Sequence, residues 1–548
     1  MHNHYRKVFL DQEKGTFLKD WHQKISVALI FPNTYTVGMS NLGFQTVYQL
    51  LNECAHVVCE RVFVDSKTTK TQCVSLESGR PLSDFHILAF SLFIESDFIH
   101  IVHTLKLSEI SLYASMRNDY EPLVMAGGVI SFLNPEPIAP FIDFFYIGEA
   151  EQMLPQLFEY LEPAQSRKKN LTAIDSLDGI YIPLHHSTNH SKTITRQFIS
   201  PIDTFDTCSA VVTKQTTFED TYLIEVSRGC PHGCRYCAAG HVYRPPRFRN
   251  LEQLSSSIQK GSLMAKKIAF MGAAVSDLPF LDQLCEQVYN NKMKLSFSSF
   301  RADTMSDRWI KKALQTGIKT MTIAPDAGSE RLRKVVNKGM CESDILSCIE
   351  RIVNAGLIHI RVYLMIGLPT ETWDDMEKTI QFCQTIQSVF VNASRKNGRI
   401  GQITISLNCF IPKAWTPFQW WAMESVQSLK KKIQYLKKHI QKIPNINLQV
   451  DSPRKALIQA ILSSGDQTIA PLIETTYRFN GDWKKAINHC HIPVNQIVGA
   501  KNLDAKLPWD YVDMGIQKSY LATEFQKAMD EKISPECHQG CKRCGVCK

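Results

Sequence analysis

Three cysteines on one short stretch are the residues whose types and spacing point most directly to chemistry. Cys230, Cys234 and Cys237 form a C-x3-C-x2-C triplet on a stretch rich in glycine and proline. Soft thiolates favour iron–sulfur clusters, and three of them leave one iron of a four-iron cluster open to another ligand. The alternative, a structural zinc site, takes four ligands, usually as two separated pairs. The spacing therefore predicts an iron–sulfur cluster with one open iron.

A second group of cysteines lies near the C-terminus, with glycines between its members. It consists of Cys537, Cys541, Cys544 and Cys547. This spacing is similar to a ferredoxin loop in reverse order, and it is too compressed for the usual two-knuckle zinc site. An auxiliary iron–sulfur cluster is the interpretation we favour; zinc and a redox-active group of thiols are the alternatives.

The triplet directly follows a strand-like run, residues 221–226, and apolar runs then alternate with helical stretches. Five further strands are expected at residues 267–271, 295–300, 320–325, 359–366 and 402–407. Such alternation predicts βα units with a parallel sheet. Reactive groups of βα barrels lie at the carboxyl ends of the strands, where the triplet is also found.

The N-terminal third shows the same alternation. Its apolar runs are residues 25–33, 86–93, 122–130 and 142–148. They predict a Rossmann-type parallel sheet covered by helices on both faces. Ligands of such sheets bind at the carboxyl ends of the strands.

The triplet after a strand resembles the signature of radical S-adenosylmethionine (SAM) enzymes. The resemblance implies a partial (β/α)6 barrel, a 4Fe-4S cluster on the three cysteines and bound SAM. It also implies reductive cleavage of SAM to methionine and a 5′-deoxyadenosyl radical, which takes hydrogen from an unreactive carbon. The electron would come from a donor such as flavodoxin or ferredoxin.

The same resemblance implies which residues contact SAM. Tyr236 occupies the aromatic position that packs on adenine, and Gly272-Ala273 lies where the family has a Gly-Gly-Glu-like element, although the acid is missing here. The other implied contacts lie at the ends of later strands: Ser299, Arg301, Gly328, Glu330 and Gly367.

Strand ends of the N-terminal third resemble those of cobalamin-binding domains. Asn33-x-Tyr35-x-x-Gly38 corresponds to that family's D-x-H-x-x-G motif, and Gly127-Gly128 follows in the expected order. A neutral phenol is a poor cobalt ligand, so the likeness is to the degenerate cobalamin-binding domains that precede radical SAM domains. Cobalamin binding and a scaffold without cobalamin both stay open.

The totals describe a globular protein. The 548 residues are 44% hydrophobic and 21% charged, with a net charge of +9 that permits an anionic partner without requiring one. The sequence has no apolar run long enough for a membrane span and no secretory signal at its N-terminus. Seventeen cysteines without an export signal indicate reduced thiols. We therefore expect a cytoplasmic protein.

The fold class expected for the whole chain is α/β. The expected parts are an N-terminal extension (1–24), the cobalamin-binding-like domain (25–162), a linker (163–217), the radical SAM barrel (218–425), a mainly helical region (426–530) and the cysteine-rich tail (531–548).

This order resembles an uncharacterised family of cobalamin-binding-domain radical SAM proteins that end in a cysteine-rich tail. It implies cobalamin-dependent methylation, or a related functionalisation, of an unreactive carbon. The alternatives are a radical enzyme that modifies RNA or protein without cobalamin, and a non-catalytic electron-transfer or scaffold protein. The substrate, whether RNA, peptide or small molecule, stays open.

Overall fold

The computed structural model describes residues 2–64, 73–186, 192–297, 300–538 and 540–547. The chain divides into two compact units. Unit 1 contains Met1–Tyr222, Ile461–Ile497 and Lys506–Gly515, and unit 2 contains Leu223–Ala460, Val498–Ala505 and Ile516–Lys548. The predicted α/β class with parallel sheets is confirmed. No helix in the described part of the chain has the length and hydrophobicity needed to cross a bilayer.

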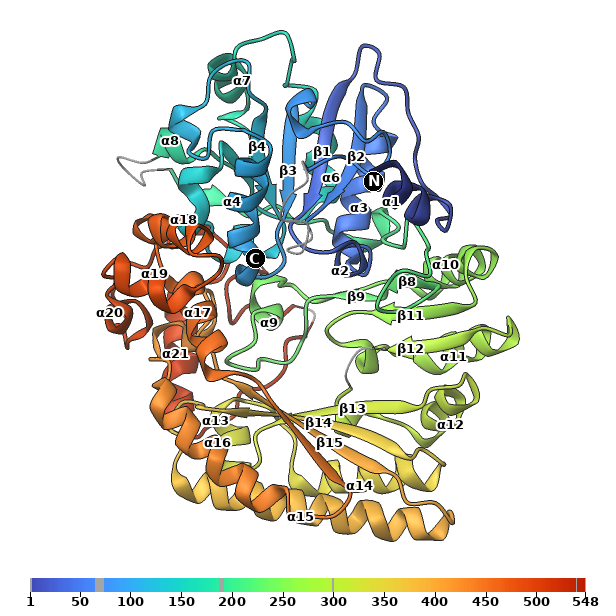
Figure 1. Ribbon diagram of the computed structural model, residues 1–548. Helices are drawn as coiled ribbons and strands as arrows, with labels where there is room; N and C mark the ends of the chain where they lie inside the picture. The colour runs from blue at the N-terminus through green and yellow to red at the C-terminus, as the bar shows by residue number, and fades with distance from the viewer. Residues whose placement is uncertain (1, 65–72, 187–191, 298–299, 539, 548) are drawn as a thin grey trace. The chain divides into compact units, whose positions relative to one another are not determined.

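Unit 1 is built around a six-stranded sheet in the order β2-β1-β3-β4-β5-β6 (Figure 1). Its strands are β1 (Ile25–Phe31), β2 (Val57–Phe63), β3 (Ile87–Ser91), β4 (Leu123–Gly127), β5 (Phe144–Tyr146) and β6 (Ile180–Tyr181). The first five are parallel, and β6 pairs antiparallel with β5 at the edge. The four predicted apolar runs correspond to β1, β3, β4 and β5.

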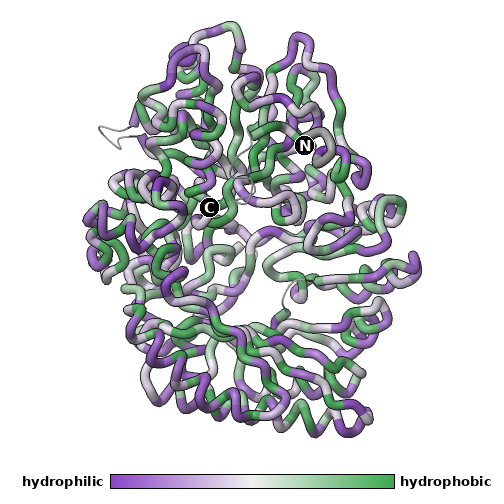
Figure 2. The backbone as a smooth tube through the Cα atoms, in the orientation of Figure 1, coloured by the Kyte–Doolittle hydropathy of each residue, from purple (hydrophilic) through white to green (hydrophobic). Residues whose placement is uncertain are grey.

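Helices cover both faces of this sheet, which is why all seven residues of β1 are buried. On one face α3 (Leu42–Glu53) packs on β2 and on α6 (Ala150–Leu157). α4 (Phe98–Leu107) packs on α18 (Ala470–Arg478), which comes from a distant part of the chain. Figure 2 shows the hydrophobic stretches that run along the strands.

The remaining elements of unit 1 are short. They are α1 (His2–Leu10), α2 (Tyr35–Gly38), α5 (Val129–Leu133), α7 (Arg167–Ile174), α8 (Pro183–His186), β7 (Ile194–Thr195), α19 (Trp483–His489) and β17 (Val512–Asp513). α17 (Pro453–Ser464) and α20 (Val494–Val498) each have residues in both units.

The two larger sheets of unit 2 have the strand orders β12-β11-β8 and β13-β14-β15-β16, and β9 (Ser227–Arg228) forms a short antiparallel pair with β10 (Arg247–Phe248). The strands are β8 (Thr221–Glu225), β11 (Lys267–Met271), β12 (Lys294–Phe297), β13 (Thr320–Asp326), β14 (His359–Ile366), β15 (Gln402–Cys409) and β16 (Ile446–Val450). A parallel bridge between Phe300 and Ile323 links the two sheets. The six predicted strands are all present, and β16 is an addition in the region expected to be mainly helical.

Helices follow most of these strands. They are α10 (Leu251–Met264), α11 (Leu281–Asn290), α12 (Asp307–Gln315), α13 (Glu330–Val335), α14 (Glu342–Asn354), α15 (Trp373–Lys396), α16 (Val426–Ile440) and α21 (Lys518–Met529). In β14 buried and partly exposed residues alternate: Val362 and Leu364 are buried, and Arg361 and Tyr363 are partly exposed. One face of this sheet is thus packed and the other is accessible, as in a barrel that encloses a ligand.

One buried carboxylate joins the start of α15 to the start of α13. Asp375 accepts hydrogen bonds from Ser329 at 2.6 Å and from the hydroxyl of Thr372 at 2.8 Å, and lies 2.5 Å from Arg331. Burial alone would raise the pKa of Asp375, but the bonds from Arg331, Ser329 and Thr372 lower it to about 2. The ionised carboxylate therefore stabilises the packing of these two helices.

We predict that Asp375→Asn lowers the free energy of unfolding by about 2–3 kcal/mol, because it removes hydrogen bonds assisted by charge. Since the folded pKa lies below the usual value of about 3.9, this stabilisation is present above about pH 4 and is lost as the pH falls towards 2. Urea denaturation measures it. The control Asp374→Asn alters an exposed carboxylate paired with Lys378 and should have little effect. Equal effects of the two variants would contradict the assignment.

Candidate functional site

The three cysteines of the triplet lie on one loop of unit 2, between β9 (Ser227–Arg228) and α9 (Ala239–Val242). Cys234 is buried, Cys230 and Cys237 are half-buried, and all three are free thiols. The thiols interact electrostatically with one another, so the loop brings them together. Gly229 begins the loop with φ 79°, where a Cβ would lie 2.4 Å from the carbonyl oxygen of Tyr243. Only glycine fits this turn.

Two cations act on Cys234. Lys338 lies 2.6 Å from a carboxylate oxygen of Asp326. Arg301, predicted at a strand end, is held by Asp303 at 2.7 Å and donates to the carbonyl oxygen of Lys338 at 2.9 Å. Burial raises the pKa of Cys234 to about 11, and the charges of Lys338 and Arg301 oppose that rise. Both cations therefore favour the thiolate.

The residues of this loop fit a four-iron cluster. Three thiolates are the soft ligands that such clusters take, and a cluster held by them is anionic. Lys338 and Arg301 supply compensating charge in a buried setting, where it acts strongly. In the described ranges, no three His, Cys, Asp or Glu side chains are placed to hold a single metal ion. The three thiols supply the ligands, and the two cations supply the charge, that a cluster with one open iron requires.

His232 lies between the first two cysteines and fixes the loop to other segments of unit 2. Its Nε2 lies 2.7 Å from Oδ2 of Asp277, and its Nδ1 lies 2.7 Å from Oε1 of Glu536. Next to it, the amide of Asn337 donates to the carbonyl oxygen of Gly233 at 3.1 Å. These bonds hold the cysteine loop to segments that follow β11 and α13.

Tyr236 lies within a hydrophobic cluster. Its ring packs against the group that contains Val335, Leu368 and Phe410, and its hydroxyl donates to Asp326. Burial and the neighbouring carboxylate raise the pKa of Tyr236 well above its ordinary value. The side chain is therefore a neutral phenol beside the cysteines. That its ring packs on adenine stays a prediction.

The other predicted contacts at the start of the barrel are Gly272, Ala273 and Ser299. A Cβ on Gly272 would lie 2.5 Å from Oγ of Ser227, so this glycine allows the end of β11 to approach β9. Ala273 is exposed. Ser299 lies outside the described residues.

Two of the predicted SAM contacts, Gly328 and Glu330, follow the fourth barrel strand and lie beside or on helices. Gly328 packs on α15, where an added Cβ would lie 2.3 Å from Oγ1 of Thr379. Glu330 is exposed on α13, 4.0 Å from Arg333, and lines a hollow together with Lys378. The contacts of both residues in the structure are those of helix packing and helix ends. That either residue contacts SAM stays a prediction.

Gly367 ends β14 in a left-handed turn with φ 79°. Its N–H donates to Oε2 of Glu371 at 2.8 Å, and that carboxylate lies 2.9 Å from Lys432. Burial raises the pKa of Glu371 to about 7, although Lys432 opposes the rise. The glycine therefore fixes a buried polar group at the end of the fifth barrel strand.

Sequence reasoning missed Lys338, Asp326, Asp277 and Arg235. Arg235 is fully buried and donates to the carbonyl oxygens at the end of α13, 2.9 Å from that of Val335. Asp326 ends β13 and Asp277 follows β11, so a search for acids at strand ends would have found both. Nothing in the sequence around Lys338 indicates that its side chain turns toward the cysteines.

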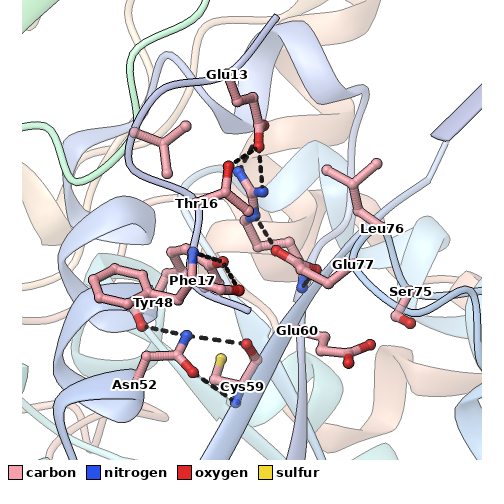
Figure 3. A network of polar contacts seen from close by, with 12 residues as sticks. Glu13, Thr16, Phe17, Tyr48, Asn52, Cys59, Glu60, Ser75, Leu76 and Glu77 are labelled. Atoms are coloured by element: carbon pink, nitrogen blue, oxygen red, sulfur yellow. Dashed lines mark hydrogen bonds and ion pairs between the residues drawn. The ribbon is translucent and has the colours of Figure 1, made fainter. Parts of the chain in front are cut away.

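In unit 1, the tyrosine at the cobalamin-motif position is bonded into a buried ion network, and Figure 3 shows the carboxylates Glu13 and Glu77 of that network. The hydroxyl of Tyr35 donates to Glu13 at 2.6 Å, and Arg61 lies 2.6 Å from both Glu13 and Glu77. Tyr35 is 2% exposed, and burial and Glu13 raise its pKa. The phenol is therefore unavailable as a cobalt ligand.

The neighbouring strand ends of unit 1 are polar and partly open. The amide of Asn33 donates to Asp97 at 3.1 Å. Gly128 has φ 100°, and a Cβ there would lie 2.4 Å from the carbonyl oxygen of Leu92. A Cβ on Gly127, by contrast, would meet nothing within 4 Å. The carboxyl end of β4 thus offers backbone to a close ligand.

The four tail cysteines also come together in unit 2. Cys541 and Cys544 are buried, and Cys537 and Cys547 are half-buried.

Two family models match this sequence. Residues 43–183 match a model described as radical SAM proteins, N-terminal, and residues 224–383 match the radical SAM superfamily. Together they span more than half of the chain. The second match begins in β8 and contains the cysteine loop, Lys338 and Arg301.

One curated relative covers most of the chain. It is the uncharacterized protein MJ0966 of Methanocaldococcus jannaschii, which is 28% identical over 451 residues, 82% of this chain and 90% of the relative.

Two solved structures share the fold. One is the radical SAM methyltransferase TsrM from Kitasatospora setae with tryptophan substrate and a SAM analogue (TM-score 0.51, 9% identity, 85% of this chain and 99% of that one). The other is the cobalamin-dependent SAM radical enzyme OxsB with aqua-cobalamin and SAM (TM-score 0.50, 14% identity, 83% and 66%).

We predict that Lys338→Met lowers the free energy of unfolding by about 3–5 kcal/mol, because Asp326 is left buried without its cation. Chemical denaturation of the metal-free protein measures this. Lys338→Arg keeps the charge and should retain much of the stability. Lys334→Met, on the exposed face of α13, is the matched control and should be nearly neutral. A loss no larger than that of the control would show that the ion pair does not stabilise this region.

Proposed function

We propose that this chain, which belongs to the radical SAM superfamily, cleaves SAM at a 4Fe-4S cluster held by Cys230, Cys234 and Cys237 and functionalises an unreactive carbon, most simply by cobalamin-dependent methylation. The observation that carries the proposal is the cysteine loop itself. It leaves the end of a barrel strand, groups three thiols and faces two cations.

A four-iron cluster held by Cys230, Cys234 and Cys237 would supply the one-electron reduction by which SAM is cleaved to methionine and a 5′-deoxyadenosyl radical. The residues of the chain hold the cysteine loop in position and keep water from the site. Lys338 and Arg301 offset negative charge at Cys234. His232, held between two carboxylates, fixes the loop. The hydrophobic cluster around Tyr236 keeps water from one side of the site.

The cobalamin part of the proposal is supported by the strand ends of unit 1. Gly127 leaves open space above β4, while Tyr35 is bonded to Glu13 and cannot reach a metal. A corrinoid bound there would lie against Gly127 and would receive no bond from the Tyr35 hydroxyl. The fold shared with OxsB, a cobalamin-dependent enzyme, is consistent with this assignment.

The buried position of Tyr35 and its bond to Glu13 also favour a second candidate function. With no cobalt ligand in the motif, unit 1 would serve as a docking domain of a radical enzyme that modifies RNA or protein. Corrinoid binding separates the two candidates.

We expect Cys230→Ala to reduce 5′-deoxyadenosine formation to background in protein reconstituted anaerobically and supplied with SAM and dithionite, because a cluster ligand is lost. Chromatography of the nucleoside product measures it. The control Cys490→Ala removes a thiol of unit 1 and should keep wild-type turnover. Turnover by the Cys230 variant would overturn the proposal, and so would an inactive wild type that carries its iron.

We expect Gly127→Val to weaken cobalamin binding at least tenfold, since about 1.4 kcal/mol of lost contact has that effect. A Cβ at position 127 would meet no other atom within 4 Å, so the temperature of unfolding should change little. Tyr35→Phe should bind cobalamin as the wild type does, with the same cob(II)alamin EPR spectrum. If the wild type binds no corrinoid, the docking-domain alternative replaces methylation. A changed spectrum in Tyr35→Phe would place the phenol on cobalt.

A further inference from the structure

The cysteine-rich tail forms a compact group in unit 2, after α21. Cys541 and Cys544 are 4% and 1% exposed. The thiols of Cys537 and Cys547 each interact electrostatically with both of them. The four cysteines of this short segment therefore lie near one another.

Two arginines surround this group. Nε of Arg543 lies 3.3 Å from Sγ of Cys541. Nη2 of the same arginine donates to the carbonyl oxygens of Pro535 and Glu536 at 2.8 and 2.6 Å. Arg244, 3% exposed, lies beside the thiol of Cys544. Guanidinium groups next to buried sulfur suit thiolates rather than neutral thiols.

The tail is bound directly to the cysteine loop. The N–H of Cys537 donates to the carbonyl oxygen of Pro231 at 2.8 Å, and Glu536 pairs with His232 at 2.7 Å. One hydrogen bond thus connects the N–H of a tail cysteine to the carbonyl group of Pro231, the residue after Cys230.

Further contacts keep the tail in this place. Arg235, which precedes Tyr236 in the loop, lies 3.2 Å from Glu524 of α21 and donates to the carbonyl oxygen of Lys532 at 2.7 Å. The N–H of Ser534 donates to Asn337 at 2.7 Å. These bonds hold the two cysteine-bearing segments side by side.

We propose that Cys537, Cys541, Cys544 and Cys547 hold a second iron–sulfur cluster, which passes electrons to the cluster of the cysteine loop. Four thiolates satisfy a complete cluster and leave no open iron, as an electron carrier needs. Zinc in structural sites is usually held by two separated cysteine pairs, and this run is continuous. The hydrogen bond from Cys537 to Pro231 supplies a short covalent and hydrogen-bonded route between the two.

The electron step is simple to balance. A flavodoxin- or ferredoxin-type donor is oxidised by one electron as the tail cluster is reduced. The tail cluster is then reoxidised as the loop cluster is reduced, and no bond or proton is exchanged. This relay rests on the proposed function, whereas the presence of the second cluster does not.

Iron and sulfide analysis of the full chain, reconstituted anaerobically, tests the cluster. The wild type should hold about eight irons, and both Cys544→Ala/Cys547→Ala and the triple loop variant Cys230→Ala/Cys234→Ala/Cys237→Ala about four each. The triple variant leaves the tail untouched, so its iron reports on the tail even if the tail variant folds poorly. Its EPR signal should not respond to SAM. Zinc in place of iron, or no iron in the triple variant, would overturn the proposal.

The relay is tested by the ratio of SAM cleavage driven by reduced flavodoxin to that driven by dithionite, a small reductant that does not need a docking site. We expect Cys544→Ala/Cys547→Ala to lose most of this ratio and Lys542→Ala, an exposed change in the same tail, to keep it. An unchanged ratio in a variant that has lost the tail iron would overturn the relay. Failure of SAM cleavage with eight irons bound would count against the proposed function and leave the second cluster standing.

Discussion

The mutual repulsion of three thiolates in a poorly hydrated loop is the constraint on which the rest of unit 2 depends. Burial raises the pKa of each cysteine of the loop, and their charges raise it further for Cys230. A cluster can bind only if the surroundings favour the ionised sulfurs. Lys338, in the turn after α13, and Arg301, after β12, favour the ionised sulfur of Cys234. The barrel therefore brings charges from distant parts of the sequence to one loop.

The same principle organises unit 1, with opposite signs. Arg61 is fully buried in β2, and burial alone would lower its pKa, but Glu77 and Glu13 raise it. Glu13 belongs to the segment before the first strand, so the ion network attaches that segment to the sheet (Figure 3). Because the hydroxyl of Tyr35 is part of the network, the side chain at the position that resembles the histidine of the cobalamin-binding motif has a structural role here.

Much of the architecture could be predicted from the sequence because apolar runs alternating with helical stretches have few other solutions. β1, β3, β4 and β5 and the six barrel strands follow directly from such runs. The cysteine loop could also be predicted, since its ligands are adjacent in sequence. β2 and β16 could not: Glu60 and Arg61 interrupt β2, and alternate residues of β16 are exposed, so neither reads as an apolar run.

Long-range partners were the part that sequence reasoning could not supply. Lys338 reaches Cys234 only through the turn after α13, and His232 meets Asp277 and Glu536 from two distant segments. Such pairs depend on tertiary packing and leave no local pattern. Gly328 is a further example, because an added Cβ there would lie 2.3 Å from Oγ1 of Thr379, a helix contact that its strand-end position did not indicate.

The order of segments in unit 1 has a consequence for biosynthesis. α4 is covered by α18, and some 360 residues separate the end of the first helix from the start of the second. At about 5–20 residues per second, the ribosome needs roughly 20–70 s to make that interval. During this time α4 lacks the helix that His103 and Lys106 contact in the finished fold, so unit 1 is completed only after α18 has been made.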